Sequence, residues 1–129
     1  FLKAKSDGSV YYSAHHDGNN SHFWLEPWTG GPEDTDPMDI LPRTSAEVAG
    51  RYCLRQSERY LGAQKEWPDS KDWFVSMAES PQCEECDRWH IEDHHGNVTL
   101  KNACAGQYLR LSVDKTSLEL VNNAVMWLP

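Results

Sequence analysis

"GNVTLKNACAGQYLRLSVDKTSLEL", residues 96–120, decides the fold of this 129-residue chain. Apolar and polar residues alternate in three short runs of this stretch, and small or polar residues such as Gly, Asn, Asp and Ser separate the runs. Alternation with a period of two predicts strands that bury one face, and the separating residues are typical of tight turns. Short runs of the same kind recur about every ten residues, whereas amphipathic helical periodicity is absent. The sequence therefore predicts an all-β fold.

The same order of strand-like runs occurs three times, which indicates an internal repeat. The runs are "FLKAK", "SVYYSA" and "HFWLEP" in the first repeat, "YLGAQ", "DWFVSM" and "RWHIED" in the second, and "YLRLS", "SLELV" and "MWLP" in the third. A further run with Gly, an apolar residue and Leu at alternate positions precedes the second repeat at Gly50 and the third at Gly96. Each full repeat thus has four strands. Three such repeats predict a β-trefoil, in which six strands form a barrel and three hairpins cap it.

The repeats set the boundaries that we expect within a single domain. Repeat one covers 1–28, repeat two 51–95 and repeat three 96–129, while 29–50 forms an acidic, proline-rich surface loop. The first repeat has no counterpart of the Gly-x-x-x-Leu strand, so the barrel lacks one of its six strands beside the run at 126–129. Unpaired backbone groups at that edge predict a cover from upstream residues, from another chain or from a local substitute.

The last run of each repeat predicts which of its aromatic residues are buried. Phe23, Trp89 and Met126 each begin a pattern of a large apolar residue, any residue and an aliphatic residue. We expect these three residues to be equivalent and to point into the barrel. Trp24 and Trp127 then lie on the opposite face of their strands.

The stretch 96–120 resembles the repeat unit of fascin-like and hisactophilin-like β-trefoils and of the amaranthin-type plant agglutinin domain, and the resemblance extends over nearly the whole chain. Resemblance to the agglutinin implies a non-enzymatic, lectin-like protein that binds galactose-type sugars on glycans or glycoproteins. The repeated Gln-x-Trp of ricin-type lectins is absent, so we do not expect three equivalent sugar sites.

Two alternative functions come from other members of the fold. The fascin and hisactophilin resemblance implies actin binding, for which a pH-tuned histidine surface is available at His15, His16, His22, His94 and His95. A trefoil protease inhibitor would instead present the segment 29–50 or 65–72 to the cleft of an enzyme.

Aromatic and polar residues in loops are the candidates for ligand binding. A Trp ring stacks on the apolar face of a sugar, and nearby Asp, Asn or His groups bind its hydroxyls. Trp28 and Trp67 lie in polar loops that contain proline, and a polar turn follows the second strand of repeat one. The candidate residues are Trp28, Trp67, Asp69, His15, His16, Asp17 and Asn19.

Charge argues against two classes of partner. Twenty acidic and twelve basic residues give a net charge of −8, and no basic run occurs, so we expect neither nucleic acid nor an anionic membrane as a partner. No stretch approaches the roughly 18 apolar residues of a membrane span. Sequons at Asn19 and Asn97 and the four cysteines leave the compartment open between secreted and cytoplasmic, and a homo-oligomer is also open.

The cysteines favour a structural role. Cys83, Cys86, His90 and His94 have a spacing that resembles a zinc site, but His90 and His94 are about 13 Å apart along an extended strand, so we expect no metal. Pairing of Ile91 with Leu100 would place Cys86 diagonally across from Cys104, which predicts a Cys86–Cys104 disulfide.

Catalytic motifs are absent. A Cys83–Cys86 redox pair lacks the βαβ unit of thioredoxins, and no G-x-S-x-G elbow for a nucleophile occurs. Acid pairs such as Asp69 with Asp72 are typical of solvated surface. We therefore expect neither an enzyme nor a cofactor.

Overall fold

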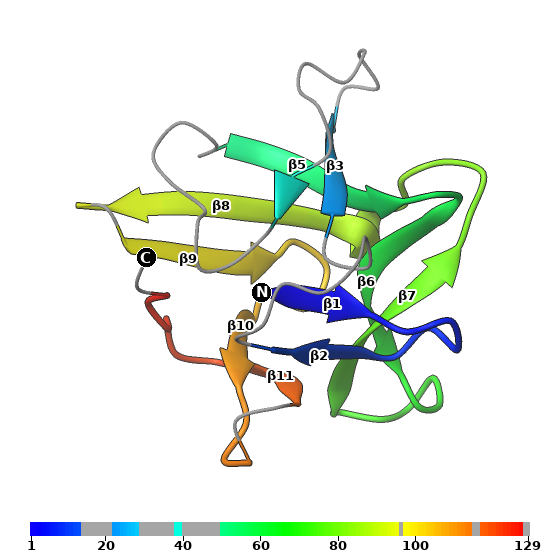
Figure 1. Cartoon of the computed structure of the whole chain (residues 1–129). Coiled ribbons are helices and arrows are strands. Elements are labelled where there is room, and N and C mark those ends of the chain that lie inside the picture. Colours follow the sequence, from blue (N-terminus) through cyan, green and yellow to red (C-terminus); the bar gives the residue numbers. More distant parts are fainter. Residues whose placement is uncertain (14–21, 29–37, 40–49, 96, 115–116, 128–129) are drawn as a thin grey trace.

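The protein is built from β-strands and one short 3-10 helix (Figure 1). The computed structural model describes residues 1–13, 22–28, 38–39, 50–95, 97–114 and 117–127. The strands in these ranges are β1 (Leu2–Ala4), β2 (Val10–Tyr12), β3 (His22–Pro27), β4 (Met38–Asp39), β5 (Gly50–Gln56), β6 (Arg59–Lys65), β7 (Trp73–Glu79), β8 (Arg88–His94), β9 (Asn97–Asn102), β10 (Tyr108–Leu111) and β11 (Leu118–Val121); the 3-10 helix η2 spans Glu85–Asp87. The described residues contain no α-helix. The all-β prediction is confirmed.

Antiparallel pairing links most of the strands into one sheet that curves into a nearly closed, barrel-like shape. β3 pairs with β5, β5 with β8, and β8 with β9. A bridge between Val98 and Trp127 continues this series beyond β9. The hairpin β6–β7 extends from β5, and β10–β11 extends from β9, while β1 and β2 form a separate two-stranded sheet. In Figure 1, β5, β8 and β9 lie side by side, and β6 and β7 lie on the opposite side of the molecule.

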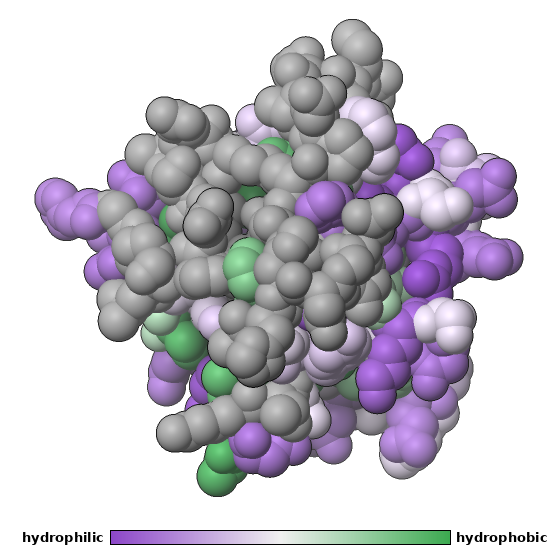
Figure 2. Space-filling model, in the orientation of Figure 1, coloured by the Kyte–Doolittle hydropathy of each residue, from purple (hydrophilic) through white to green (hydrophobic). Residues whose placement is uncertain are grey.

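One face of the barrel strands forms the hydrophobic core. Alternate residues point inward, such as Phe23 and Leu25 on β3 and Trp89 and Ile91 on β8, and all four are buried. Burial of each such side chain contributes about 1.5–3 kcal/mol, which is why the alternation fixes which face of each strand turns inward. Figure 2 shows that the surface over β6, β7 and the β1–β2 turn is largely hydrophilic.

Three leucines at matching positions of the predicted repeats lie in this core. Leu2, Leu61 and Leu109 are all fully buried. The indole nitrogen of Trp89 donates a hydrogen bond of 2.9 Å to the main-chain oxygen of Leu61, and Trp127 makes the same bond of 3.0 Å to Leu109. Each tryptophan thus ties a barrel strand to the strand that begins the neighbouring hairpin.

The predicted register of the last strand is wrong by one residue. Met126 is 46% exposed, whereas Trp127 is 9% exposed and packs in the core. Trp127, not Met126, is therefore the counterpart of Trp89. An indole buries more apolar area than a thioether and can also pair its N–H with a buried carbonyl, so the chain turns Trp127 inward.

The edge of β3 that faces away from β5 pairs with the two-residue strand β4. Phe23 lies opposite Met38, and His22 opposite Asp39. β4 belongs to the segment 29–50, which we expected to be a surface loop. A piece of that segment thus pairs with part of an edge whose backbone groups need partners.

Two disulfides hold the segment that leads into β8. Cys86 bonds to Cys104 with the Cα atoms 4.6 Å apart, and the predicted pairing of Ile91 with Leu100 is present, so this prediction is confirmed. Cys53 bonds to Cys83 with the Cα atoms 6.4 Å apart, a pair that the sequence did not single out. Because both cysteines of the zinc and redox alternatives are bonded to other partners, their thiolates are not available for either role.

Candidate functional site

The loop 66–72, which joins β6 to β7, presents an exposed tryptophan on a fixed turn. The amide of Ser70 donates a hydrogen bond of 3.0 Å to the main-chain oxygen of Trp67, which closes a four-residue turn with Pro68 at its second position. Proline favours that position because its ring presets φ. Ser70 is itself buried, and its hydroxyl accepts a 3.1 Å hydrogen bond from the amide of Asp72. The turn is therefore held from both ends.

Trp67 is 55% exposed although its backbone is held. Asp69, on the same turn, is also exposed. We call these two residues the Trp67 platform. An exposed ring beside an acceptor of hydrogen bonds can bind a ligand that has both an apolar face and hydroxyl groups, which is the chemistry that the sequence analysis expected of these residues.

Further aromatic residues lie where the hairpin meets this loop. Trp73 is paired across the hairpin with Lys65, whose Nζ lies 4.8 Å from the centre of the Trp73 ring. Phe74, the next residue, is 43% exposed. The loop end of β6–β7 thus carries three aromatic side chains close together in sequence.

Trp28 lies in a different environment. Its ring stacks on His90 with the ring centres 5.0 Å apart and the planes 9° from parallel. The guanidinium groups of Arg51 and Arg88 lie 5.7 and 5.8 Å from the centre of the same ring. These contacts come from β5 and β8, so the structure does not join Trp28 and Trp67 into one site.

The remaining sequence candidates are outside the described residues. His15, His16, Asp17 and Asn19 all fall within 14–21. Ligand binding by these four residues stays a prediction.

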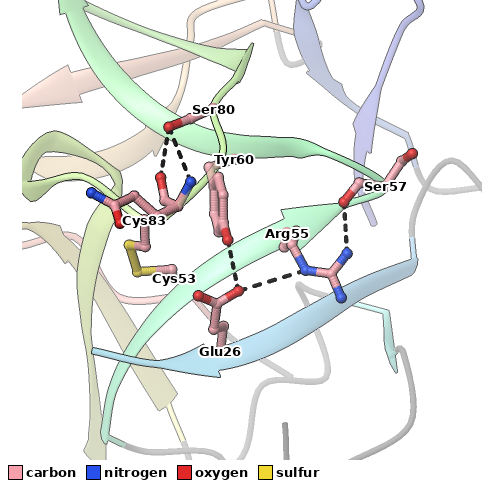
Figure 3. Close-up of polar contacts among 8 residues, drawn as sticks. Glu26, Cys53, Arg55, Ser57, Tyr60, Ser80 and Cys83 are labelled. Atoms are coloured by element: carbon pink, nitrogen blue, oxygen red, sulfur yellow. Dashed lines mark hydrogen bonds and ion pairs between the residues drawn. A yellow bond between two sulfur atoms is a disulfide. The ribbon is translucent and has the colours of Figure 1, made fainter. Parts of the chain in front are cut away.

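A polar groove lies at the other end of the β6–β7 hairpin. It has a volume of about 600 Å³ and is lined by Arg55, Ser57, Glu58, Tyr60, Glu79, Ser80 and Pro81. Glu26 contacts two of these lining residues (Figure 3): the Tyr60 hydroxyl donates a 2.7 Å hydrogen bond to the Glu26 carboxylate, and the Arg55 Nε lies 3.6 Å from it. Arg55 also donates a 2.6 Å bond to the main-chain oxygen of Ser57.

The sequence analysis missed this groove because its residues come from separate strands. Glu26 is on β3, Arg55 is on β5, and Glu79 is at the end of β7. A signal exists only at Ser57 and Glu58, which join two strand-like runs and so predict a tight hairpin turn. Ser57 indeed has a positive φ of 54°.

Comparisons with known proteins do not add to this description. No protein-family model matches the chain, and no curated protein matches it. No helix among the described residues is long and apolar enough to cross a membrane. Across the same residues, His, Cys, Asp and Glu side chains form no group of three that could hold a metal ion.

Proposed function

We propose that this chain is a β-trefoil that binds carbohydrate without catalysing a reaction on it, as a lectin does. The single observation that carries the proposed function is the half-exposed ring of Trp67 on a turn held by hydrogen bonds.

The order of strand pairing supports the β-trefoil. The barrel series β3–β5–β8–β9 and the bridge from Val98 to Trp127 alternate the last strand of one predicted repeat with the first strand of the next. The intervening strands pair as the hairpins β1–β2, β6–β7 and β10–β11, one for each repeat. β4 pairs with β3 at the edge where the missing first strand of repeat one would lie.

Ring geometry supports carbohydrate as the ligand. A galactose-type sugar, the class implied by the agglutinin resemblance, gathers ring C–H groups on one face because its 4-hydroxyl is axial. That face can stack on the Trp67 indole, and Asp69 can accept hydrogen bonds from the hydroxyls at the edge of the sugar. Because hydrogen bonds already hold the turn, binding does not have to order it, which lowers the entropic cost.

The disulfides support the setting in which such a protein acts. All four cysteines are bonded, and disulfides persist mainly in oxidising compartments such as the cell exterior. Glycans and glycoproteins are abundant partners there. A secreted lectin-like protein is consistent with this chemistry.

A glycan array with matched variants tests the proposal. The wild-type protein is expected to retain galactose-type glycans, and Trp67→Ala is expected to weaken that binding at least about fivefold, because a stacked ring contributes on the order of 1 kcal/mol or more. Asp69→Ala should weaken it as well. Met126→Ala, which removes a comparably exposed apolar side chain elsewhere, is the control and should bind as the wild type does.

Two outcomes would contradict the proposal. One is an array on which no glycan is retained, and the other is a Trp67→Ala variant that binds as tightly as the wild type. In either case, cosedimentation with actin at two pH values and a panel of proteases test the alternative functions. The actin alternative draws on His94, which lies 3.5 Å from the Glu92 carboxylate on β8.

A further inference from the structure

A row of cationic and aromatic side chains crosses the outer face of the barrel. Arg51 on β5 lies opposite His90 on β8, and His90 lies opposite Lys101 on β9, which in turn lies opposite Tyr108 on β10. Inward-facing residues flank each of these positions, such as Trp89 and Ile91 beside His90. We call the surface formed by Trp28, Arg51, Arg88, His90, Lys101 and Tyr108 the cation–aromatic face.

Cations and rings are interleaved on this face. Arg51 and Arg88 both lie within 6 Å of the centre of the Trp28 ring, which His90 covers by stacking. At the other end, the Lys101 Nζ lies 5.6 Å from the centre of the Tyr108 ring. Contact with a π-face orients a cation without neutralising its charge. The positive charge of these residues therefore remains available to a partner.

Within the ranges that the structure describes, the cations of this face have no acidic partner. Among the described residues, no carboxylate forms an ion pair with Arg51, Arg88 or Lys101, whereas Arg55 pairs with Glu26 and Arg110 pairs with Glu119. The chain has twenty acidic and only twelve basic residues. With acids in such excess, three cations on neighbouring strands that have no acidic partner among the described residues form a local cluster of positive charge, although Glu92 lies on the same face of β8.

Unused hydrogen-bonding groups lie in the same cluster. Trp28 Nε1, Arg88 Nε and His90 Nε2 are shielded from solvent, and none of them has a hydrogen-bond partner within the described part of the chain. Buried polar atoms without a partner are uncommon in native proteins, because each gives up its hydrogen bonds to water without replacement. The residues that carry them are only partly buried, so these nitrogens belong to side chains that reach the surface of this face. An anion with many hydrogen-bond acceptors would gain bonds to these nitrogens, whose desolvation cost was already incurred when the protein folded.

We propose that the cation–aromatic face binds an acidic polysaccharide, one whose sugar rings carry sulfate or carboxylate groups. The sulfate or carboxylate groups would accept hydrogen bonds from Arg51, Arg88 and Lys101, and the sugar rings would lie against Trp28 and Tyr108. This binding goes beyond the proposed recognition of galactose-type sugars, because it uses a different surface and a different class of ligand.

Charge spacing favours a polysaccharide over nucleic acid. Arg51 and Lys101 are separated by two strand spacings, or about 9.6 Å. Neighbouring cations on this face are therefore about one strand spacing or more apart. Duplex DNA carries one charge for each 1.7 Å or so of its axis, which is much denser than the spacing of the cations on this face. A sulfated or uronate-bearing polysaccharide has its charges spaced by sugar rings, which matches the sparser cations of this face.

Binding to heparin, whose repeating units contain no galactose-type sugar, tests the proposal at low salt, with chemically desulfated heparin and a single-stranded oligonucleotide of equal total charge as the comparison ligands. The wild-type protein is expected to bind the sulfated chain most tightly, and the binding should weaken as salt is added. The double variant Arg51→Gln/Arg88→Gln should bind at least about tenfold more weakly, because charged hydrogen bonds are lost at two positions. Arg110→Gln, which removes a cation that Glu119 already neutralises, is the matched control and should bind as the wild type does.

Two further variants distinguish the possible outcomes. If the double variant does not fold, Arg51→Gln alone serves, because Arg51 is exposed at the surface. Trp67→Ala should leave the binding of heparin unchanged, so failure of the galactose-binding proposal would not affect this one. The proposal is overturned if the sulfated chain does not bind at low salt, if the arginine variants bind as the wild type does, or if the oligonucleotide binds as tightly as the sulfated chain.

Discussion

The indole nitrogen of Trp127 donates a 3.0 Å hydrogen bond to the main-chain oxygen of Leu109 in the interior of the protein. The bond from Trp89 to Leu61 has the same geometry, at 2.9 Å. Each bond joins a tryptophan of the barrel to the first strand of the hairpin that precedes it in the chain. These bonds give the predicted second and third repeats a common anchor that combines a large buried ring with one fixed polar contact.

The first prediction concerns this anchor at the C-terminal strand. Trp127→Phe removes the donor to Leu109 and part of the buried ring, and it should lower the free energy of unfolding by about 1–3 kcal/mol. Met126→Ala changes an exposed neighbour and should have an effect within about 0.5 kcal/mol. Urea denaturation of both variants measures the difference. A larger loss for Met126→Ala than for Trp127→Phe would contradict the observed register.

The contrast between Trp127 and Met126 shows where sequence patterning suffices and where it does not. On β8, the polar residue His90 separates Trp89 from Ile91, so only one register buries the apolar residues, and the prediction was correct. In "VMWL", residues 125–128, four apolar residues follow one another, and two registers bury similar numbers of them. The hydrogen bond to Leu109 distinguishes the registers, and no pattern of hydrophobicity contains it.

Sequence patterning likewise predicts only some of the disulfides and only part of the candidate site. Cys86–Cys104 could be predicted because a strand register fixes the distance between the two residues. Cys53–Cys83 could not, because Cys83 lies in an irregular segment after β7 whose path has no periodicity. Trp67 could be named as a candidate, but its exposure depends on which other segments cover the loop. That is a property of the packed chain.

The second prediction concerns the two disulfides. They close loops with sequence separations of 30 and 18 residues, for which chain entropy predicts a stabilisation of about 3–4 kcal/mol each. Cys53→Ala/Cys83→Ala should cost more than Cys86→Ala/Cys104→Ala, because Cys53 is fully buried and its loss also leaves a cavity. Intact mass should rise by two hydrogens per bond on reduction. Equal stability of the oxidised and reduced proteins would refute the prediction.

The third prediction concerns the close packing of η2 on β6. A Cβ added at Gly62 would overlap Oδ1 of Asp87 and lie 3.1 Å from the main-chain oxygen of Cys86. The helix cannot easily move away, because Cys86 is bonded to Cys104 and its oxygen accepts a 2.9 Å hydrogen bond from the Asn102 side chain. Gly62→Ala should therefore lower the free energy of unfolding by about 1–3 kcal/mol. Ala63→Gly, on the same strand, is a control for the general cost of a strand glycine, and a neutral Gly62→Ala would contradict the packing.

The last prediction concerns pH and the Asp87 carboxyl group. Burial raises the pKa of Asp87 above its ordinary value of 3.8, and the nearby Glu84 carboxylate adds to this rise, while a hydrogen bond from the Glu84 amide opposes it. The folded state therefore binds the proton more readily than the unfolded chain does. By linkage, the contribution of Asp87 to stability is most favourable at acid pH and is lost as pH rises from 3.8 through the raised pKa.

Asp7 supplies a comparison of opposite sign. Hydrogen bonds from the Ser9 hydroxyl and amide lower the pKa of Asp7, so its contribution is present at neutral pH and is lost as pH falls through the lowered pKa. As pH rises from acid to neutral, Asp87→Asn should gain stability relative to the wild type, whereas Asp7→Asn should lose it. Urea midpoints at several pH values measure both trends, and the other carboxyl groups cancel in each difference. Trends of the same sign in the two variants would show that burial does not control Asp87.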